Sequence, residues 1–243
     1  MTQQLTAYPV WDRTVRIFHW INVLCILGLI AIGVAILNSK ALGVTNDGKL
    51  LLKTVHVYIG YVFAANLTWR IVWGFIGNRY SRWKSILPFN AEHRAQLTVM
   101  KEGAKTGKPV GFLGHSPIAR LMVGFLFVLM SVQAITGLVL AGTDVYMLPF
   151  GNIVKESIAI DSTTVDIIKP YSKEGIDDAA YKDMRDVRKP FVTVHYYAFW
   201  VLLAAILLHI LGVVVSELRE RNGLVSAMFN GKKVFADKPF DAE

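Results

Sequence analysis

Cysteine is almost absent from this chain, which has only Cys25 in 243 residues, inside an apolar run. A single cysteine excludes a disulfide framework and a thiolate metal cluster. The sequence also contains no C-x-x-C-H motif, so any haem would be held without covalent attachment. The ligands of any metal or cofactor therefore have to come from other side chains.

Charged residues are scarce as well, at 18% of the chain against 53% hydrophobic residues, with a mean hydropathy of +0.42. This balance excludes an ordinary cytosolic globular protein. The net charge is +8, but the basic residues gather beside the hydrophobic runs, which is typical of topology signals and not of nucleic-acid binding. The first apolar run follows a polar start and has no small-residue cleavage site, so we expect a retained helix and not a signal peptide.

Four apolar stretches reach the ~20 helical residues needed to cross a hydrocarbon core of about 30 Å. They run from Ile17 to Leu37, from Thr54 to Ile76, from Pro117 to Ala141 and from Phe191 to Ser216. Proline suits the first turn of a helix, where its missing N–H costs nothing. We therefore predict an all-α fold, an integral membrane four-helix bundle in which residues 1–243 form a single domain.

The connections between the spans differ in charge, and this difference predicts the topology. The segment between the second and third spans carries seven basic residues against Glu92 and Glu102. The basic residues are Arg79, Arg82, Lys84, Arg94, Lys101, Lys105 and Lys108. By the positive-inside rule this segment is cytoplasmic, which places both termini in the cytoplasm of a bacterium and the 49-residue loop 142–190 in the periplasm. A loop of that length is the expected docking surface for a partner outside the inner membrane.

Four of the six histidines lie inside the predicted spans: His19, His56, His195 and His209. An ionisable residue within a span is costly, so each predicts a functional site. His195 and His209 are 14 residues apart, which is ~21 Å of helical rise and leaves them within ~40° of one helix face. The topology puts His19 and His209 toward the cytoplasm, and His56 and His195 toward the periplasm. The depths therefore predict two pairs, His19 with His209 and His56 with His195.

A pair of imidazoles from separate helices suits the iron of a haem that lies between them. Zinc or copper would usually need three or four clustered ligands, and no carboxylate or thiolate accompanies these pairs. We therefore predict two haem b groups, stacked as a path for electrons through the membrane. Gly60 and Gly212 follow His56 and His209 closely, and they predict either room for a macrocycle or close helix packing.

Arg70 is the other charge inside the spans, 14 residues after His56 and nearer the cytoplasmic end. Its side chain either extends to the lipid headgroups or pairs with a haem propionate or a quinone oxygen. Gln133 and Thr136 in the third span are expected to bond to neighbouring helices. His93, in the basic segment, is expected to be solvated.

Three segments carry a resemblance to a known family: RIFHWIN, HVYIGYVFAANLTWRIVWGFIGNRYSRW and GHSPIARLMVGFLFVLMSVQAITG. Over nearly its whole length the chain resembles the prokaryotic cytochrome b561 family, and within it the b-type cytochrome subunit of membrane-bound nickel–iron hydrogenases. The resemblance implies two haems b held by histidines of the first, second and fourth helices. It also implies electron exchange between a periplasmic redox partner and the quinone pool.

The resemblance bears on the quinone and on the partner too. It implies a quinone near the cytoplasmic haem, around Arg16, Arg70 and His115. His115, in the GHSP motif, is otherwise an ordinary interfacial residue beside the helix cap Ser116. The tail LRERNGLVSAMFNGKK is more similar to relatives that serve periplasmic c-type cytochromes. The expected partner is therefore either a c-type cytochrome or a hydrogenase-like enzyme.

Two other functions compete with this hypothesis. A membrane anchor would tether a periplasmic oxidoreductase and use the four histidines only structurally. A metal-ion transporter would use the same histidines, but the spans lack the Asp or Glu that such pathways often contain.

Overall fold

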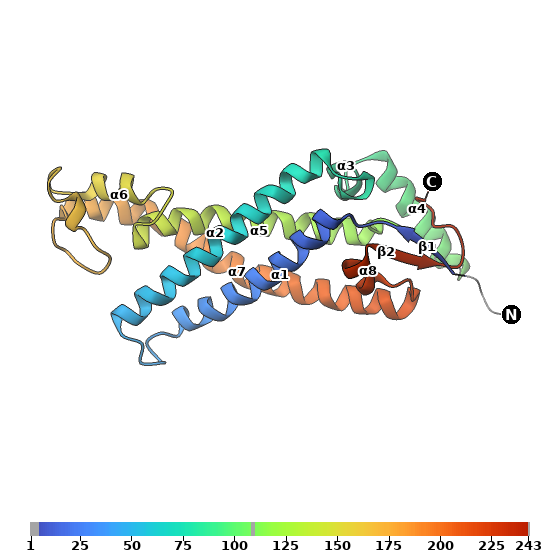
Figure 1. Ribbon diagram of the computed structural model, residues 1–243, viewed down its shortest axis with the longest axis horizontal. Helices are drawn as coiled ribbons and strands as arrows, with labels where there is room; N and C mark the ends of the chain where they lie inside the picture. Colours follow the sequence, from blue (N-terminus) through green and yellow to red (C-terminus); the bar gives the residue numbers. More distant parts are fainter. Residues whose placement is uncertain (1–4, 108–109, 243) are drawn as a thin grey trace. The chain divides into compact units, whose positions relative to one another are not determined.

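Four long helices dominate the computed structural model, which describes residues 5–107 and 110–242. They are α1 (Arg13–Leu37), α2 (Asn46–Ile76), α5 (Pro117–Val145) and α7 (Asp178–Glu220) (Figure 1). Each contains one of the predicted spans and is long and apolar enough to cross a membrane. The predicted all-α membrane fold is therefore confirmed. Lys108, one of the basic residues used for the topology, lies outside the described residues.

Shorter elements link the long helices. Between α2 and α5 lie η1 (Arg79–Ser81), α3 (Trp83–Ile86) and α4 (Ala91–Thr106). Between α5 and α7 lie α6 (Gly151–Ile158) and η2 (Val165–Ile167), and α8 (Leu224–Asn230) follows α7. Near the two ends of the chain, β1 (Thr6–Pro9) and β2 (Lys232–Phe235) pair antiparallel, with Thr6 opposite Phe235.

The chain divides into two compact units, and each long helix contributes a segment to both. The terminal unit comprises the described residues within Met1–Trp20, Leu67–Val128 and Leu202–Glu243. The loop unit comprises Ile21–Asn66 and Leu129–Val201. The prediction that residues 1–243 form a single domain stays a prediction.

In the terminal unit, the C-terminal tail folds back onto the segment that precedes α5. Asp241 accepts hydrogen bonds from the backbone N–H groups of Leu113 and Gly114, the second at 2.8 Å. Lys233 is 3% exposed, and its Nζ donates to the carbonyl oxygens of Phe112 and Gly114 at 3.2 and 3.0 Å. A small core of Val10, Trp11, Val15, Leu113, Ala227 and Phe235 lies beside these bonds. The tail is therefore part of the folded unit.

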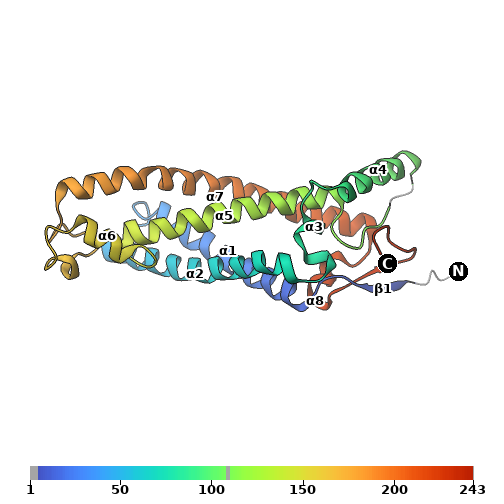
Figure 2. The ribbon, with the colours of Figure 1, turned by 90° about the horizontal axis from the view of Figure 1, so that it is seen from above.

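In the loop unit, α6 lies beside the end of α5 and the start of α7 (Figure 2). Ile158, Ile168 and Ile176 form its small core. Asp144 at the end of α5 accepts hydrogen bonds from Lys53 of α2 and from Arg188 of α7, the latter at 3.0 Å. These charges tie three of the long helices together at one place.

Helix α7 begins at Asp178, well before the predicted start of the fourth span at Phe191. Pro190 therefore lies inside the helix, although proline is a frequent helix boundary. Asp177 accepts a hydrogen bond from the Ala180 N–H at 2.7 Å, as an N-cap does, and so begins the helix earlier. Together with α5, which continues to Val145, this leaves only residues 146–177 of the expected 49-residue loop between the two helices.

Large apolar side chains are exposed along the long helices. Leu24 is 69% exposed, Phe75 71% and Leu207 61%. A water-soluble protein rarely leaves so many such side chains uncovered. Lipid tails are the medium in which these surfaces are stable.

Candidate functional site

In the loop unit, His56 of α2 and His195 of α7 face each other. Their ring centroids are 6.5 Å apart, with an angle of 76° between the ring planes. The Nδ1 of His56 is buried and has no hydrogen-bond partner among the described residues.

The distance between the two ring centroids is close to the distance expected if both imidazoles bound one metal ion. A bond from a metal to an imidazole nitrogen is about 2 Å, and a nitrogen lies roughly 1.1 Å from the centre of a ring built from bonds of about 1.33 Å. Two such ligands on opposite sides of one ion would have centroids about 6.2 Å apart by this sum. The observed 6.5 Å agrees, so His56 and His195 can hold one metal ion between them.

Glycines flank both rings of this pair. A Cβ added at Gly33 of α1 would lie 3.6 Å from Cε1 of His56, and one at Gly137 of α5 would lie 3.4 Å from Cε1 of His195. Added at Gly60 or Gly212, it would meet no atom within 4 Å. Close helix packing therefore does not account for Gly60 and Gly212, and the space beside them is open.

In the terminal unit, the structure brings together His19 of α1 and His209 of α7. The two imidazoles are near enough that a charge on one would repel a charge on the other. The His19 ring stands edge-on to Trp20, with the centroids 5.2 Å apart, and its Nδ1 is buried without a hydrogen-bond partner among the described residues. Each unit thus holds one of the two histidine pairs expected from the depths.

Arg70 is buried in the terminal unit, at 3% exposure. Its Nη2 donates to the Ser81 carbonyl oxygen at 3.1 Å, and its guanidinium lies 5.4 to 5.9 Å from the ring centroids of Phe18, Trp83 and Phe127. A side chain that reached the lipid headgroups would be exposed. Nη1 is buried and has no partner among the described residues, so this arginine has a donor available for an acceptor such as a carboxylate.

His115 packs on Trp11, with the ring centroids 4.7 Å apart, and its Nδ1 is buried without a partner among the described residues. Burial, followed by the charges of Lys233 and Arg70, lowers the pKa of His115 to about 3. The ring is therefore neutral at physiological pH. A neutral imidazole can donate one hydrogen bond and accept another, as a contact to a quinone or a propionate would require.

Acidification is expected to destabilise the terminal unit through His115. Its pKa is about 3 in the folded protein and 6.5 as an ordinary histidine, so between these values the unfolded chain binds more protons. The contribution of His115 to stability is therefore present above pH 6.5 and is lost as the pH falls toward 3. Lowering the pH from 7 to 4.5 should cost about 2.5 kcal/mol at this site.

Thermal unfolding in detergent measures this effect. The midpoint should fall on acidification, and His115→Gln should reduce that fall because glutamine does not titrate. An unchanged pH dependence in His115→Gln would contradict the assignment.

Arg16 contacts the C-terminal helix. Its Nη1 donates to the carbonyl oxygen of Phe229 in α8, and its Nε is buried without a partner among the described residues. Nearby, burial lowers the pKa of Lys233 to about 8. The terminal unit therefore concentrates buried cationic groups near His115.

His93 was expected to be solvated, and this prediction was wrong, because its side chain is 4% exposed. It lies on a buried face of α4 with Gln96, which is 0% exposed. Beside this face lies Arg120 of α5, 2% exposed, whose Nη2 donates to Glu92 at 3.0 Å. Burial, and then the charge of Arg120, lower the pKa of His93. The sequence missed this burial because His93 shares its segment with basic residues, among them Arg94, Lys101 and Lys105 of the same helix.

The expectation that Gln133 and Thr136 bond to a neighbouring helix is confirmed, and both bond to His195 of α7. Thr136 of α5, which was expected to bond to a neighbouring helix, places its Oγ1 2.8 Å from Nδ1 of His195. Gln133 donates from Nε2 to the backbone carbonyl oxygen of the same histidine at 3.2 Å. In the sequence, these two polar residues lie one turn apart on α5, and this spacing indicated that both face the same neighbouring helix.

The number of ligands in each histidine pair indicates which kind of metal centre the pair could hold. Within residues 5–107 and 110–242, no group of three or more His, Cys, Asp or Glu side chains could hold a metal ion. Two imidazoles per site therefore fit a metal whose other ligands belong to a cofactor, as the four nitrogens of a haem do.

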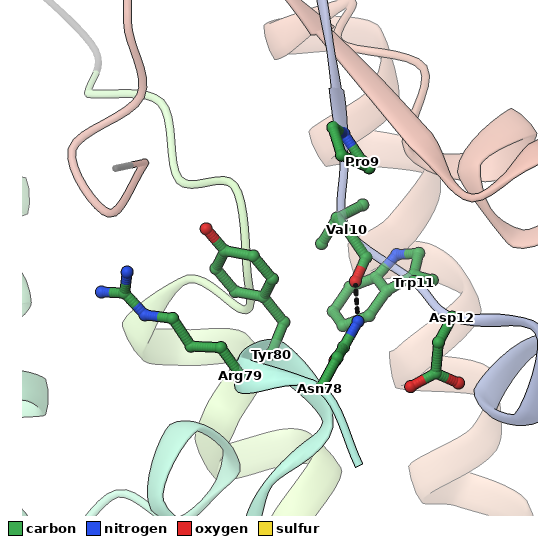
Figure 3. Close-up of a pocket in the computed structure, with 7 residues that line it drawn as sticks. All are labelled: Pro9, Val10, Trp11, Asp12, Asn78, Arg79 and Tyr80. Atoms are coloured by element: carbon green, nitrogen blue, oxygen red, sulfur yellow. Dashed lines mark hydrogen bonds between the residues drawn. The ribbon is translucent and has the colours of Figure 1, made fainter.

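A shallow pocket of about 290 Å³ lies elsewhere in the terminal unit. It is lined by Pro9, Val10, Trp11, Asp12, Asn78, Arg79 and Tyr80 (Figure 3). Asn78 donates from Nδ2 to the Val10 carbonyl oxygen at 2.9 Å, which fixes the chain after β1 against the end of α2. The histidine pairs do not line this pocket, so we do not assign it to the candidate site.

Comparison with known proteins gives a consistent set of relatives. The sequence model of a family described as prokaryotic cytochrome b561 matches residues 10–231. A protein of Rhizobium leguminosarum bv. viciae is 26% identical over 238 residues, which cover 94% of this chain and 90% of the relative. One of Bradyrhizobium diazoefficiens is 28% identical over 246 residues, covering 96% and 87%. Both are named "Probable Ni/Fe-hydrogenase B-type cytochrome subunit".

A protein of Escherichia coli (strain K12) is 31% identical over 154 residues, which cover 57% of this chain and 62% of the relative. It is named "Probable Ni/Fe-hydrogenase 1 B-type cytochrome subunit". No solved structure matches the chain.

Proposed function

Because this chain belongs to the prokaryotic cytochrome b561 family, a family of multi-pass membrane b-type cytochromes, we propose that it is a dihaem protein that carries electrons between a periplasmic redox partner and membrane quinone. The observation that carries the proposal is the placement of one histidine pair in each unit. One pair would suffice for a single haem. Two pairs, whose members on α7 are His195 and His209, 14 residues apart, provide ligands for two haems.

The four histidines hold the irons in this proposal. His56 and His195 would hold the iron of one haem, and His19 and His209 would hold that of the other. A bound haem b supplies a one-electron couple between ferrous and ferric iron. The protein would contribute the ligands and the open space beside Gly60 and Gly212.

The polar groups of the terminal unit bind the anionic or carbonyl oxygens of the cofactors. Arg70, with its buried Nη1, is the strongest candidate for a haem propionate or a quinone oxygen. Arg16 and the neutral ring of His115 complete this set. Arg70 and His209 are both near enough to His115 to act on it electrostatically, which supports a quinone site at the haem of the terminal unit.

The topology follows from charge. The terminal unit contains the basic segment around α4 and both described chain ends, joined by the β1–β2 pair. We assign this unit to the cytoplasmic side of a bacterial inner membrane by the positive-inside rule. The loop unit, with residues 146–177, then faces the periplasm and carries the docking surface.

The partner in the periplasm is a hydrogenase in this proposal, because the similar proteins carry that name. A c-type cytochrome is the alternative, because the resemblance of the tail after α7 implies such a partner. In both cases the partner exchanges electrons with the haem of the loop unit, and quinone exchanges them near the other haem.

Replacing all four paired histidines together separates electron transfer from mere anchoring. A variant carrying His→Ala at positions 19, 56, 195 and 209 should still bring the partner to the membrane and should lose partner-dependent quinone reduction. The measurement is reduction of a water-soluble quinone analogue by membranes that contain the partner, with co-purification as the test of partner binding. An anchor with structural histidines would keep both properties, and that result would refute the proposal.

A further inference from the structure

Helix α5 supplies none of the four paired histidines, yet it contacts one of them closely. Thr136 is 5% exposed, and its Oγ1 lies 2.8 Å from Nδ1 of His195. The next residue is Gly137, where an added Cβ would lie 3.4 Å from Cε1 of the same ring. The imidazole of His195 therefore rests directly against one turn of α5.

The direction of this hydrogen bond can be worked out from the other contacts of the hydroxyl. Thr136 Oγ1 also lies 2.7 Å from the carbonyl oxygen of Val132 and 3.3 Å from that of Gln133. A carbonyl oxygen only accepts, so the single hydroxyl hydrogen points toward Val132. The hydroxyl oxygen is then the acceptor for His195, and Nδ1 of the imidazole carries the proton.

This assignment fixes the tautomer of His195. A neutral imidazole with its proton on Nδ1 has a lone pair on Nε2. The hydrogen bond also restrains the rotation of the ring, and Gln133 restrains the backbone carbonyl of the same residue from one turn away. His56 has no such partner for its own Nδ1 among the described residues, so the two rings of the pair are held differently.

We propose that Thr136 is a positioning residue for His195: its hydroxyl oxygen holds the Nδ1–H group and presents Nε2 to the axial position of the haem in the loop unit. This inference rests on the proposed function. A hydrogen bond from Nδ1–H makes the ligating nitrogen more basic, and a more basic ligand favours ferric iron. Thr136 therefore lowers the reduction potential of this haem and slows its dissociation.

Thr136→Val tests the proposal in the full-length chain, because valine keeps the branched shape and removes the oxygen. Reduction potentials of both haems are measured by redox titration of the absorption spectrum, and haem loss by transfer to apomyoglobin. The potential of the loop-unit haem should rise, and its transfer should become roughly 10-fold faster. The potential of the other haem should not change. Thr136→Ser, which retains the hydroxyl, should restore both values.

Thr143→Val is the matched control on the same helix. Thr143 is 8% exposed, and its hydroxyl donates to the Val139 carbonyl oxygen at 2.8 Å, as that of Thr136 does to Val132. It is not among the groups that contact His195, so its loss should leave both potentials unchanged. An equal shift in the two valine variants would overturn the proposal, because the effect would then come from the helix and not from the histidine.

The outcomes also separate this inference from the proposed function. If the unsubstituted chain holds no haem, the proposed function fails and the inference fails with it. If both haems are present and Thr136→Val changes neither potential nor transfer rate, only the inference fails. If Thr136→Val does not assemble, Thr136→Ser is compared with Thr136→Cys, in which the thiol is a weak acceptor of similar size. Equal potentials in these two variants would overturn the role of the hydroxyl.

Discussion

Replacing His56 or His195 by alanine is expected to remove the same haem and to leave the other in place. The centroids of the two rings are 6.5 Å apart, so either substitution would remove one member of the same pair of ligands. The spectra of the two variants should therefore coincide, with one redox transition lost and one retained. His19→Ala and His209→Ala should lose the complementary transition.

A histidine outside the pairs provides the control. His93 is also buried, at 4% exposure, but it lies on α4 outside the four membrane-length helices. His93→Ala should keep both transitions. If instead His56→Ala and His195→Ala removed different haems, the pairing within each unit would be wrong.

Arg70→Gln is expected to lower the potential of the haem in the terminal unit and to weaken quinone reduction. The guanidinium is 3% exposed, so water screens its charge poorly. A positive charge near a haem stabilises the reduced state, and its removal should shift the potential downward on the order of tens of millivolts. Redox titration and quinone-reduction kinetics measure the two effects.

Arg94→Gln removes the same charge from the same unit, at an exposed position of α4. Water and salt screen a charge at such a position, so this control should leave the potential unchanged. Arg70→Lys keeps the positive charge but loses the forked geometry of the guanidinium. Its haem potential should therefore stay close to that of the unsubstituted chain, while its rate of quinone reduction should fall. An unaltered potential in Arg70→Gln would show that this arginine only stabilises the fold.

The sequence predicted those features of the molecule that depend on local patterns. The four long helices follow from runs of apolar residues, because a hydrocarbon core demands both length and apolarity. The separation of the two histidine pairs follows from the regular rise of one helix and the alternation of direction between spans. Neither inference needs knowledge of how the helices are rotated.

Features that depend on rotation and on non-local contacts were missed. Hydropathy gives no orientation for α5, so the sequence predicted that Thr136 bonds to a neighbouring helix but not that its partner is His195, 2.8 Å away. The burial of His93 likewise depends on α4 packing with Arg120 of α5. The anchoring of the tail by Asp241 joins residues separated by 127 positions or more, which no sequence pattern connects.

The start of α7 was missed for a different reason. The fourth span was predicted to begin at Phe191, directly after Pro190. In the structure Asp177 caps a helix that begins before it, and Arg188 anchors this first part to Asp144 of α5 at 3.0 Å. The hydrogen bond at Asp177 and the ion pair at Arg188 thus outweigh the tendency of proline to interrupt a helix.

The haem-to-protein ratio of the purified chain tests the central claim most directly. It is obtained from the absorbance of the extracted haem and from the protein concentration, in the unsubstituted chain and in the four single histidine variants. The account predicts b-type spectra with about two haems per chain, and about one in each single variant, as two axial ligands per iron require. A folded, colourless protein would contradict it, and so would an unsubstituted chain with a single haem that any of the four substitutions abolished.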